Sequence, residues 1–285
     1  MNTKTTTQTD TLTQTKGTLV LGGNGKTGRR IVDRLESKGL PVQIGSRSGS
    51  PSFDWHESSN WDAVLEDVQA IYIAYYPDLA VPGASDHIRE LVAKAKQHGV
   101  GRIVLLSGRG EEEAQLCERI VMNSGIPATV VRCAWFNQNL TESFMHEMVM
   151  AGTIALPIHG VKEPFVDAED IADVSFVALT EDGHAGKIYE MTGPRLIAFE
   201  EIAEEISNAT GRPIQFVPIS NDEFVDGLRE AQLPDVMVKL LDYLFKVGLD
   251  GRNECLGDGV QQALGRPPRD FKDFVAEAKA SGAWN

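Results

Sequence analysis

Four glycines in the segment GGNGKTG, residues 22–28, have the spacing of a phosphate-binding loop. The segment satisfies both GxGxxG and GxxGxxG, and it follows an apolar run and precedes a segment with helical periodicity. Glycines at this spacing permit a tight turn, a close approach of the backbone to a pyrophosphate and close packing of the helix on the strand. The free N–H groups at the helix start would face the phosphate charge. We therefore expect dinucleotide binding by Gly22, Asn24, Gly25, Lys26, Thr27 and Gly28.

A rival phosphate motif ends in the same way, because Gly25, Lys26 and Thr27 resemble the end of a Walker A loop. That motif requires glycine at position 20, where Val20 stands. The sequence therefore does not favour hydrolysis of a nucleoside triphosphate.

The identity of the dinucleotide is read at the end of the next apolar run, where the chain continues Gly45-Ser46-Arg47-Ser48. An acidic residue there would bind a ribose 2′-hydroxyl, whereas a cation would pair with a 2′-phosphate. No Asp or Glu is present and Arg47 can form a bidentate phosphate contact, so Ser46 and Arg47 favour NADP(H) over NAD(H). The alternative is that Arg47 is an ordinary solvated loop charge.

The elements that position this loop alternate between short apolar runs and longer helical segments, which is typical of βαβ units and a parallel sheet. We expect an α/β fold, a Rossmann-type doubly wound parallel sheet with a small, mainly helical C-terminal substrate lobe. Residues 1–16 are expected to be a disordered tail, 17–155 the NADP(H)-binding core, and 156–285 the rest of the sheet and the lobe. The expected strands are 18–23, 41–46, a weak segment at 52–55, 70–76, 102–107, 128–133 and 187–193. The expected helices include 26–38, 60–68, 86–97, 111–124 and 199–210, with a strand end followed by a helix at 165–180 and further helices after Pro218.

Composition limits the classes of partner. The 285 residues carry a formal net charge of -14, which repels nucleic acid and anionic lipid. No apolar run approaches the roughly 20 residues that span a bilayer, and neither the three cysteines nor the six histidines have metal-ligand spacing. We expect no nucleic-acid, membrane or metal partner, a cytoplasmic location, a small-molecule substrate, and a monomer or homodimer.

Typical short-chain dehydrogenases use a Tyr-xxx-Lys pair, whose ammonium group lowers the pKa of the phenol so that it can transfer a proton. None of the five tyrosines here is followed by lysine four residues later. The helix after residues 102–107 carries acidic and apolar residues, including Glu118. The run Glu111-Glu112-Glu113 is interpreted as a solvated helix N-terminus, where negative charge is favourable.

Together these segments resemble the NmrA-like atypical short-chain dehydrogenases, in the branch that contains agroclavine dehydrogenase and festuclavine synthase of ergot-alkaloid pathways. The resemblance extends from about residue 17 to the C-terminus. It rests on residues 19–31, 46–48, 53–55, 102–107, 130–140, 165–174, 189–194 and 264–274.

The resemblance implies site residues beyond the glycine loop. Asp54 and Trp55 would lie near the adenine, and Ala74, Tyr75 and Ser107 near the nicotinamide ribose. The substrate side would be bordered by Tyr76, Trp135, Phe136 and Asn139. Cys133 stands where the family usually has proline, which affects the shape of the pocket. Ordinary core packing is the alternative for these aromatic residues.

The leading hypothesis from the sequence is an NADPH-dependent reductase of a small or medium hydrophobic organic substrate with an activated C=N, C=C or C=O bond. The cofactor would supply the hydride. The catalytic residues are unknown, with Tyr75, Tyr76 and Ser107 as candidate proton donors. A non-catalytic NADP(H)-binding redox sensor is the alternative, and an isomerase or epimerase that uses bound nucleotide ranks last.

Overall fold

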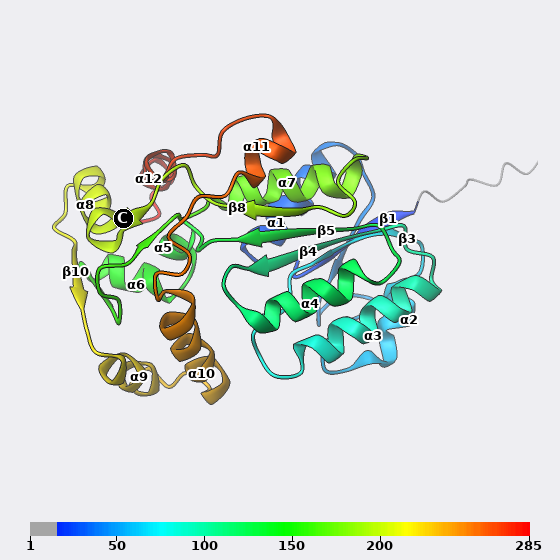
Figure 1. Cartoon of the computed structure of the whole chain (residues 1–285), viewed down its shortest axis with the longest axis horizontal. Helices are drawn as coiled ribbons and strands as arrows, with labels where there is room; N and C mark the ends of the chain where they lie inside the picture. The colour runs from blue at the N-terminus through cyan, green and yellow to red at the C-terminus, as the bar shows by residue number, and fades with distance from the viewer. Residues whose placement is uncertain (1–15) are drawn as a thin grey trace, which may run out of the picture.

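A six-stranded parallel sheet forms the centre of the protein, as the computed structural model of residues 16–285 shows (Figure 1). Its strands are β1 (Gly17–Leu21), β2 (Val42–Gly45), β3 (Val68–Ile73), β4 (Arg102–Gly108), β5 (Ala128–Cys133) and β8 (Ile188–Met191), in the order β2-β1-β3-β4-β5-β8. This arrangement confirms the predicted Rossmann-type fold. The strand order reverses between β1 and β3, and ligands of open α/β sheets bind at the carboxyl end of such a switch point.

Helices cover both faces of the sheet (Figure 1). On one face lie α1 (Lys26–Ser37), α7 (Ala168–Thr180) and α11 (Gly259–Leu264). On the other face lie α2 (Trp61–Val64), α3 (Ala84–Gln97) and α4 (Glu112–Met122), and the 3₁₀ turn η1 (Ser58–Asn60) precedes α2. Successive side chains of a strand point to opposite faces. Thus Leu19 joins the core under α3 and α4, whereas Val20 joins the core under α1 and α7. The uninterrupted apolar sequence of β1 reflects burial on both sides.

The second part of the molecule is a lobe beside the carboxyl ends of the strands (Figure 1). Its helices are α5 (Asn139–Glu142), α6 (Phe144–Met150), α8 (Phe199–Thr210), α9 (Asn221–Glu230), α10 (Asp235–Tyr243), the π turn η2 (Leu244–Gly248) and α12 (Phe271–Ala280). It also contains two small sheets that the sequence did not predict: parallel β6 (Thr153–Leu156) with β10 (Gln215–Pro218), and antiparallel β7 (Lys162–Glu163) with β9 (Ile197–Ala198). Its hydrophobic core begins at Leu140. The division at residues 155 and 156 remains a proposal.

The expected strand at residues 52–55 is instead a loop with one isolated bridge, between Asp54 and Glu57. The apolar residues of this loop do not alternate along a strand but pack inward as an aromatic cluster. Trp55 lies 4.9 Å from Phe53 and 5.8 Å from Trp61, measured between ring centroids. Three neighbouring aromatic residues therefore stabilise a loop whose sequence resembles a strand.

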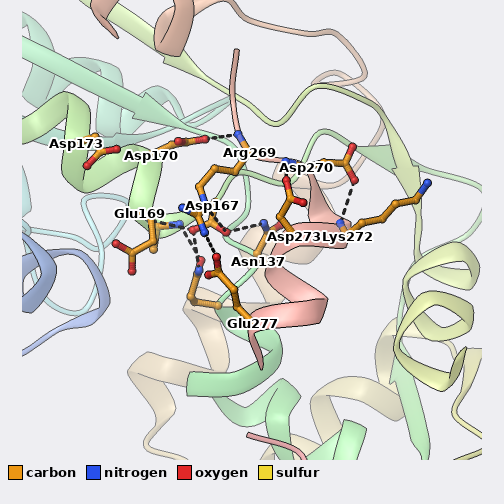
Figure 2. Close-up of polar contacts among 12 residues, drawn as sticks. Asn137, Asp167, Glu169, Asp170, Asp173, Arg269, Asp270, Lys272, Asp273 and Glu277 are labelled. Carbon is orange, nitrogen blue, oxygen red and sulfur yellow. Dashed lines mark hydrogen bonds and ion pairs between the residues drawn. The ribbon is translucent and has the colours of Figure 1, made fainter. Parts of the chain in front are cut away.

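The segment that precedes α12 is attached to the start of α7 by a polar network (Figure 2). Asp167, the N-cap of α7, accepts hydrogen bonds from the backbone N–H of Glu169 (2.8 Å) and from Nε2 of Gln138 (2.9 Å). The backbone N–H of Arg269 donates to Oδ2 of Asp170 at 2.7 Å. The motifs at 165–174 and 264–274 thus meet in space and hold the end of the chain against the sheet domain.

Two further expectations concern order and location. The disordered tail predicted for residues 1–16 falls almost entirely on residues 1–15, which lie outside the described residues. Within residues 16–285, no helix combines the length and apolar character that crossing a membrane requires. The cytoplasmic location remains a prediction.

Candidate active site

The glycine loop connects β1 to α1 by a tight turn in which Gly22 and Gly28 lie close to neighbouring backbone atoms. Gly22 has φ +78°, a left-handed conformation that glycine adopts without strain. A Cβ on Gly28 would lie 2.2 Å from the carbonyl oxygen of Gly22, so this close contact between helix and strand requires glycine at position 28. The two ends of the motif have the packing roles that their spacing predicted.

The N-terminus of α1 has the features of an anion site. Gly25 is the N-cap, and within the described chain it has no capping side chain and no acidic residue follows in the first turn. A Cβ on Gly25 would have only one neighbour within 4 Å, the Gly22 oxygen at 3.2 Å, so the space in front of the loop is open. The N–H groups of this turn and the helix dipole thus suit the diphosphate of a dinucleotide.

The side chains of the loop have different surroundings. Asn24 is exposed and Lys26 is half-buried. Burial lowers the pKa of Lys26, while the nearby Glu142 carboxylate acts to raise it. The Thr27 hydroxyl accepts a hydrogen bond from the Tyr72 hydroxyl at 2.8 Å in the core, which leaves the Thr27 backbone N–H to face a ligand.

Ser46 and Arg47 lie at the turn immediately after β2, beside the glycine loop in the parallel sheet. The Arg47 side chain is exposed, and the structure assigns it no hydrogen-bond or ion-pair partner among residues 16–285. Ser46 Oγ lies 3.4 Å from Ser48 Oγ. This short polar turn therefore presents an unpaired guanidinium group at the place where a 2′-phosphate would be bound.

Trp55 and Tyr75 lie mainly in the core under α3 and α4, with their ring centroids 4.5 Å apart. The Asp54 carbonyl accepts a hydrogen bond from the indole of Trp61, so its backbone supports the aromatic cluster. Ala74 contacts the glycine loop, because a Cβ on Gly22 would lie 3.0 Å from its carbonyl oxygen. The contacts of Trp55 and Tyr75 are mainly those of core packing, although Tyr75 also lines the cavity described next.

A cavity of about 360 Å³ lies at the carboxyl ends of β4 and β5 and extends to the lobe. Lys26 of the glycine loop lines this cavity, and an apolar part of its lining comes from Met237, Leu240, Leu241 and Leu244 of the α10 region. The remaining polar wall includes Asp78, Ser107, Arg109, Glu111, Glu163 and Asn253. Such an apolar cleft with few polar groups at a domain junction is typical of a site for a small organic ligand.

Three of the four predicted substrate residues line this cavity, namely Trp135, Phe136 and Asn139. Trp135 is fixed by an edge-on contact with Phe245, at 4.9 Å between ring centroids. Tyr76 lies elsewhere, because its side chain is 68% exposed and does not line the cavity. Three of the residues that were predicted to border the substrate thus lie together after the end of β5, and Tyr76 is not among them.

A buried charge network supports the floor of the cavity. Ser107 donates a hydrogen bond to Oε1 of Glu118 at 2.6 Å. Arg132 contacts both oxygens of Glu118, with its Nε 2.8 Å from Oε1, and also contacts Glu190. Arg109 reaches the other oxygen of Glu190 at 3.1 Å. The helix that follows β4 therefore contributes a buried carboxylate that is paired with arginine.

The hydroxyl groups of Tyr75 and Ser107 have polar neighbours, and Tyr76 does not line the cavity. The Tyr75 hydroxyl lies 2.7 Å from Nδ1 of His87, and burial raises the pKa of Tyr75 to about 12. The Ser107 hydroxyl proton is directed to Glu118. Tyr76 points into solvent. Tyr75 and Ser107 therefore share the cavity lining, whereas Tyr76 lies apart from it.

Carboxyl groups that the sequence did not identify do line the cavity. Glu111 was interpreted as a solvated residue at a helix start, which is wrong, because it is only 8% exposed. Only Glu112 and Glu113 of that run are exposed. Asp78 and Glu163 line the same cavity. The available signal was position, because Glu111 lies three residues after the end of β4, at the edge of the sheet where ligands bind.

Glu163 provides a prediction for stability. Its side chain is 1% exposed, and burial raises its pKa to about 7, against a weak hydrogen bond from the Trp135 N–H. The unfolded carboxyl ionises near pH 4.5, so the native state loses stability between about pH 4.5 and pH 7. We expect Glu163→Gln to remove this loss. Urea unfolding should show the variant more stable than wild type by about 3 kcal/mol at pH 8.5, with a much smaller gain at pH 5.

The control for this prediction is Glu230→Gln, at the exposed end of α9. Its difference from wild type should be small and similar at both pH values, since surface substitutions change stability by about 0.5 kcal/mol or less. An equal gain for Glu163→Gln at pH 5 and pH 8.5 would contradict the assigned cause.

Comparison with known proteins shows which family the chain belongs to. The sequence profile of the NmrA-like family matches residues 112–264, more than half of the chain. The chain belongs to the NmrA-like family. This match confirms the resemblance seen in the sequence. Of the motifs that carried the resemblance, residues 130–140 contribute to the cavity wall and residues 165–174 contain the start of α7.

Several relatives align over nearly the whole chain. Festuclavine synthase II of Penicillium roqueforti is 30% identical, with 92% of this chain and 98% of that protein covered. Prestalk A differentiation protein A of Dictyostelium discoideum is 28% identical over 93% and 94%. NAD(P)H azoreductase of Xenophilus azovorans is 27% identical over 93% and 99%.

Among solved structures, the NADPH-dependent quinone oxidoreductase QOR2 of Escherichia coli, in complex with NADPH, superposes with a TM-score of 0.76. It is 19% identical, and the match covers 92% of this chain and 99% of that one. This likeness agrees with the Rossmann-type fold predicted from the sequence.

Proposed function

We propose that this NmrA-like protein is an NADPH-dependent reductase, an oxidoreductase that transfers hydride to a small or medium hydrophobic organic substrate with an activated C=N, C=C or C=O bond. The observation that carries the proposal is the cavity, which is lined both by Lys26 of the glycine loop and by apolar residues of the α10 region. A cofactor held by the loop and a substrate held by the lobe would meet there.

Relatives and fold support the proposal. The names of the azoreductase and the quinone oxidoreductase describe reductases that use NAD(P)H or NADPH. When bound, the nicotinamide supplies the hydride. The residues of this chain would bind the diphosphate at the α1 N-terminus, orient an apolar substrate against Trp135 and Phe136, and exclude water with the leucines of α10.

The preference for NADPH gives a prediction at Arg47. We expect Arg47→Ala to weaken NADPH binding by about 10- to 100-fold, because a hydrogen bond to a charged group contributes about 1.5–3 kcal/mol. NADH affinity should not change, since NADH has no 2′-phosphate. Isothermal titration with both cofactors measures this. Arg229→Ala, an exposed arginine on α9, is the control and should leave both affinities unchanged.

The reductase assignment is tested by NADPH oxidation with a panel of enones, aldehydes, quinones, azo compounds and iminium cations. We expect turnover of at least one activated class. Micromolar NADPH binding without any turnover, together with recovery of a protein partner, would instead favour the redox sensor. Turnover of a nucleotide-linked substrate without net NADPH oxidation would favour the isomerase or epimerase. Oligomeric state, monomer or homodimer, remains a prediction that analytical ultracentrifugation can decide.

A further inference from the structure

We propose that Glu111, which lies beside Asp78 in the wall of the cavity, is the proton donor for substrates that become anionic when they accept hydride. This inference rests on the proposed reductase function and supplies the acid that the missing Tyr-xxx-Lys pair leaves unassigned. Glu111 and Asp78 come from the two loops that follow β4 and β3, so both lie at the carboxyl edge of the sheet.

The Glu111 carboxyl is buried and packs closely against the backbone at the end of β4. Its side chain is 8% exposed, and its Oε2 has no hydrogen-bond partner among the described residues. A Cβ on Gly108 would lie 2.2 Å from Glu111 Oε1, so glycine at the end of β4 gives the carboxyl its place. Both residues line the cavity. A buried oxygen without a partner, beside a cavity, is available to a ligand.

Asp78 explains why Glu111 would carry a proton. The two carboxyl groups line the same cavity and each acts on the charge of the other, and two neighbouring carboxylates in a buried site cannot both remain ionised. Oδ1 of Asp78 also accepts a hydrogen bond from the Ala80 N–H at 2.8 Å, which favours the charged form on Asp78. The shared proton is therefore assigned to Glu111.

Burial, followed by the Asp78 charge, raises the pKa of Glu111 to about 9. The other acidic groups that face it, Glu113 and Glu118 of α4, act in the same direction. Tyr243 of α10 interacts with Glu113 through its hydroxyl. The remaining charged groups around the cavity are Lys26, Arg109 and Glu163. Below about pH 9 the donor is protonated, as a general acid must be.

The reaction balances in two steps. Hydride from NADPH forms the new C–H bond of the substrate, and the π electrons of the C=O or conjugated C=C bond move to oxygen as an alkoxide or enolate. Glu111 then gives its proton to that anion and becomes a carboxylate, which regains a proton from water. A cationic acceptor needs no such proton, because hydride alone converts an iminium or triarylmethyl cation into a neutral product.

This difference defines the experiment. Wild type and Glu111→Gln are compared in NADPH oxidation with 2-cyclohexenone and 4-nitrobenzaldehyde, which require a proton, and with malachite green and N-methyl-3,4-dihydroisoquinolinium, which do not. We expect kcat of the variant to fall by about 100-fold or more with the neutral acceptors and to stay within about twofold with the cations. The wild-type rate with neutral acceptors should fall above about pH 9, and this fall should be absent in the variant.

Two further variants separate a proton donor from a structural role. Glu112→Gln changes the exposed neighbour in the same acidic run and should behave as wild type. Gly108→Ala should displace the Glu111 carboxyl and reproduce the selective loss, while thermal unfolding and NADPH affinity stay close to wild type. Equal rates of wild type and Glu111→Gln with neutral acceptors would overturn the inference, as would wild-type turnover of cations alone. Absence of turnover with every acceptor would instead contradict the reductase proposal.

Discussion

Gly28→Ala should remove NADPH binding and destabilise the protein by about 3 kcal/mol, at the upper end of the usual cost of overpacking. The added Cβ would lie 2.2 Å from the Gly22 oxygen and 2.8 Å from the Gly23 Cα. Both are backbone atoms, so no side-chain rotation relieves the contact. Helix α1 would have to move away from β1, and the N–H groups that would bind the diphosphate move with it.

Thermal unfolding and isothermal titration with NADPH measure this result. Gly227→Ala is the matched control, because Gly227 is also inside a helix but a Cβ there would have no neighbour within 4 Å. That variant should be more stable by about 0.5–1 kcal/mol and bind NADPH normally. Gly25→Ala separates fold from binding: φ of -82° suits alanine, so it should unfold as wild type does and yet bind NADPH about 100-fold more weakly. Normal NADPH affinity in both Gly28→Ala and Gly25→Ala would contradict the loop assignment.

Arg132→Met should be at least as harmful to stability, with a loss of about 3–5 kcal/mol. Glu118 is buried, with 4% side-chain exposure, and Arg132 is its charged partner. Without the guanidinium, the carboxylate would keep only the Ser107 hydroxyl as a partner from this network. An uncompensated buried charge is much more costly than the pair that it replaces. The floor of the cavity next to Ser107 would therefore become unstable.

Urea unfolding at pH 7 measures this loss, and the double variant Glu118→Gln/Arg132→Met tests its cause. Removing both charges should recover most of the stability, as expected when a coupled pair is deleted together. Arg89→Met is the control, because its ion pair with Asp86 is 58% and 77% exposed and contributes about 1 kcal/mol at most. A double variant as unstable as Arg132→Met would show that the loss has another origin.

The sheet and the cofactor end of the site could be predicted because local sequence determines them. The glycine spacing has only one structural solution between a buried strand and a helix, and Arg47 follows the next strand directly. Uninterrupted apolar runs likewise indicated strands that are buried on both faces. At residues 52–55 the same reasoning failed, because an aromatic cluster with Trp61 decides the structure of a short apolar segment.

The substrate end could not be read in the same way because tertiary contacts form it. Glu163 lines the cavity together with Trp135, which follows β5, and Glu111 lines it together with Asp78 and residues of α10. In the sequence, Glu111 is one of three adjacent glutamates without a distinguishing pattern. The four short strands of the lobe pair segments up to 62 residues apart in register, such as Thr153 with Gln215, and two to four residues are too few for a periodicity signal.

Deuteride transfer from NADPH deuterated at C4 tests the central claim most directly. The protein is incubated with this cofactor and each enone, aldehyde or iminium acceptor of the panel, whose reduction forms a C–D bond that does not exchange with water, and the product is examined by mass spectrometry and NMR. The account predicts one deuterium on the reduced carbon, from only one of the two C4 epimers, and loss of the transfer in Gly25→Ala. Products without deuterium, or unchanged acceptors in the presence of bound NADPH, would contradict the assignment of this chain as an NADPH-dependent reductase.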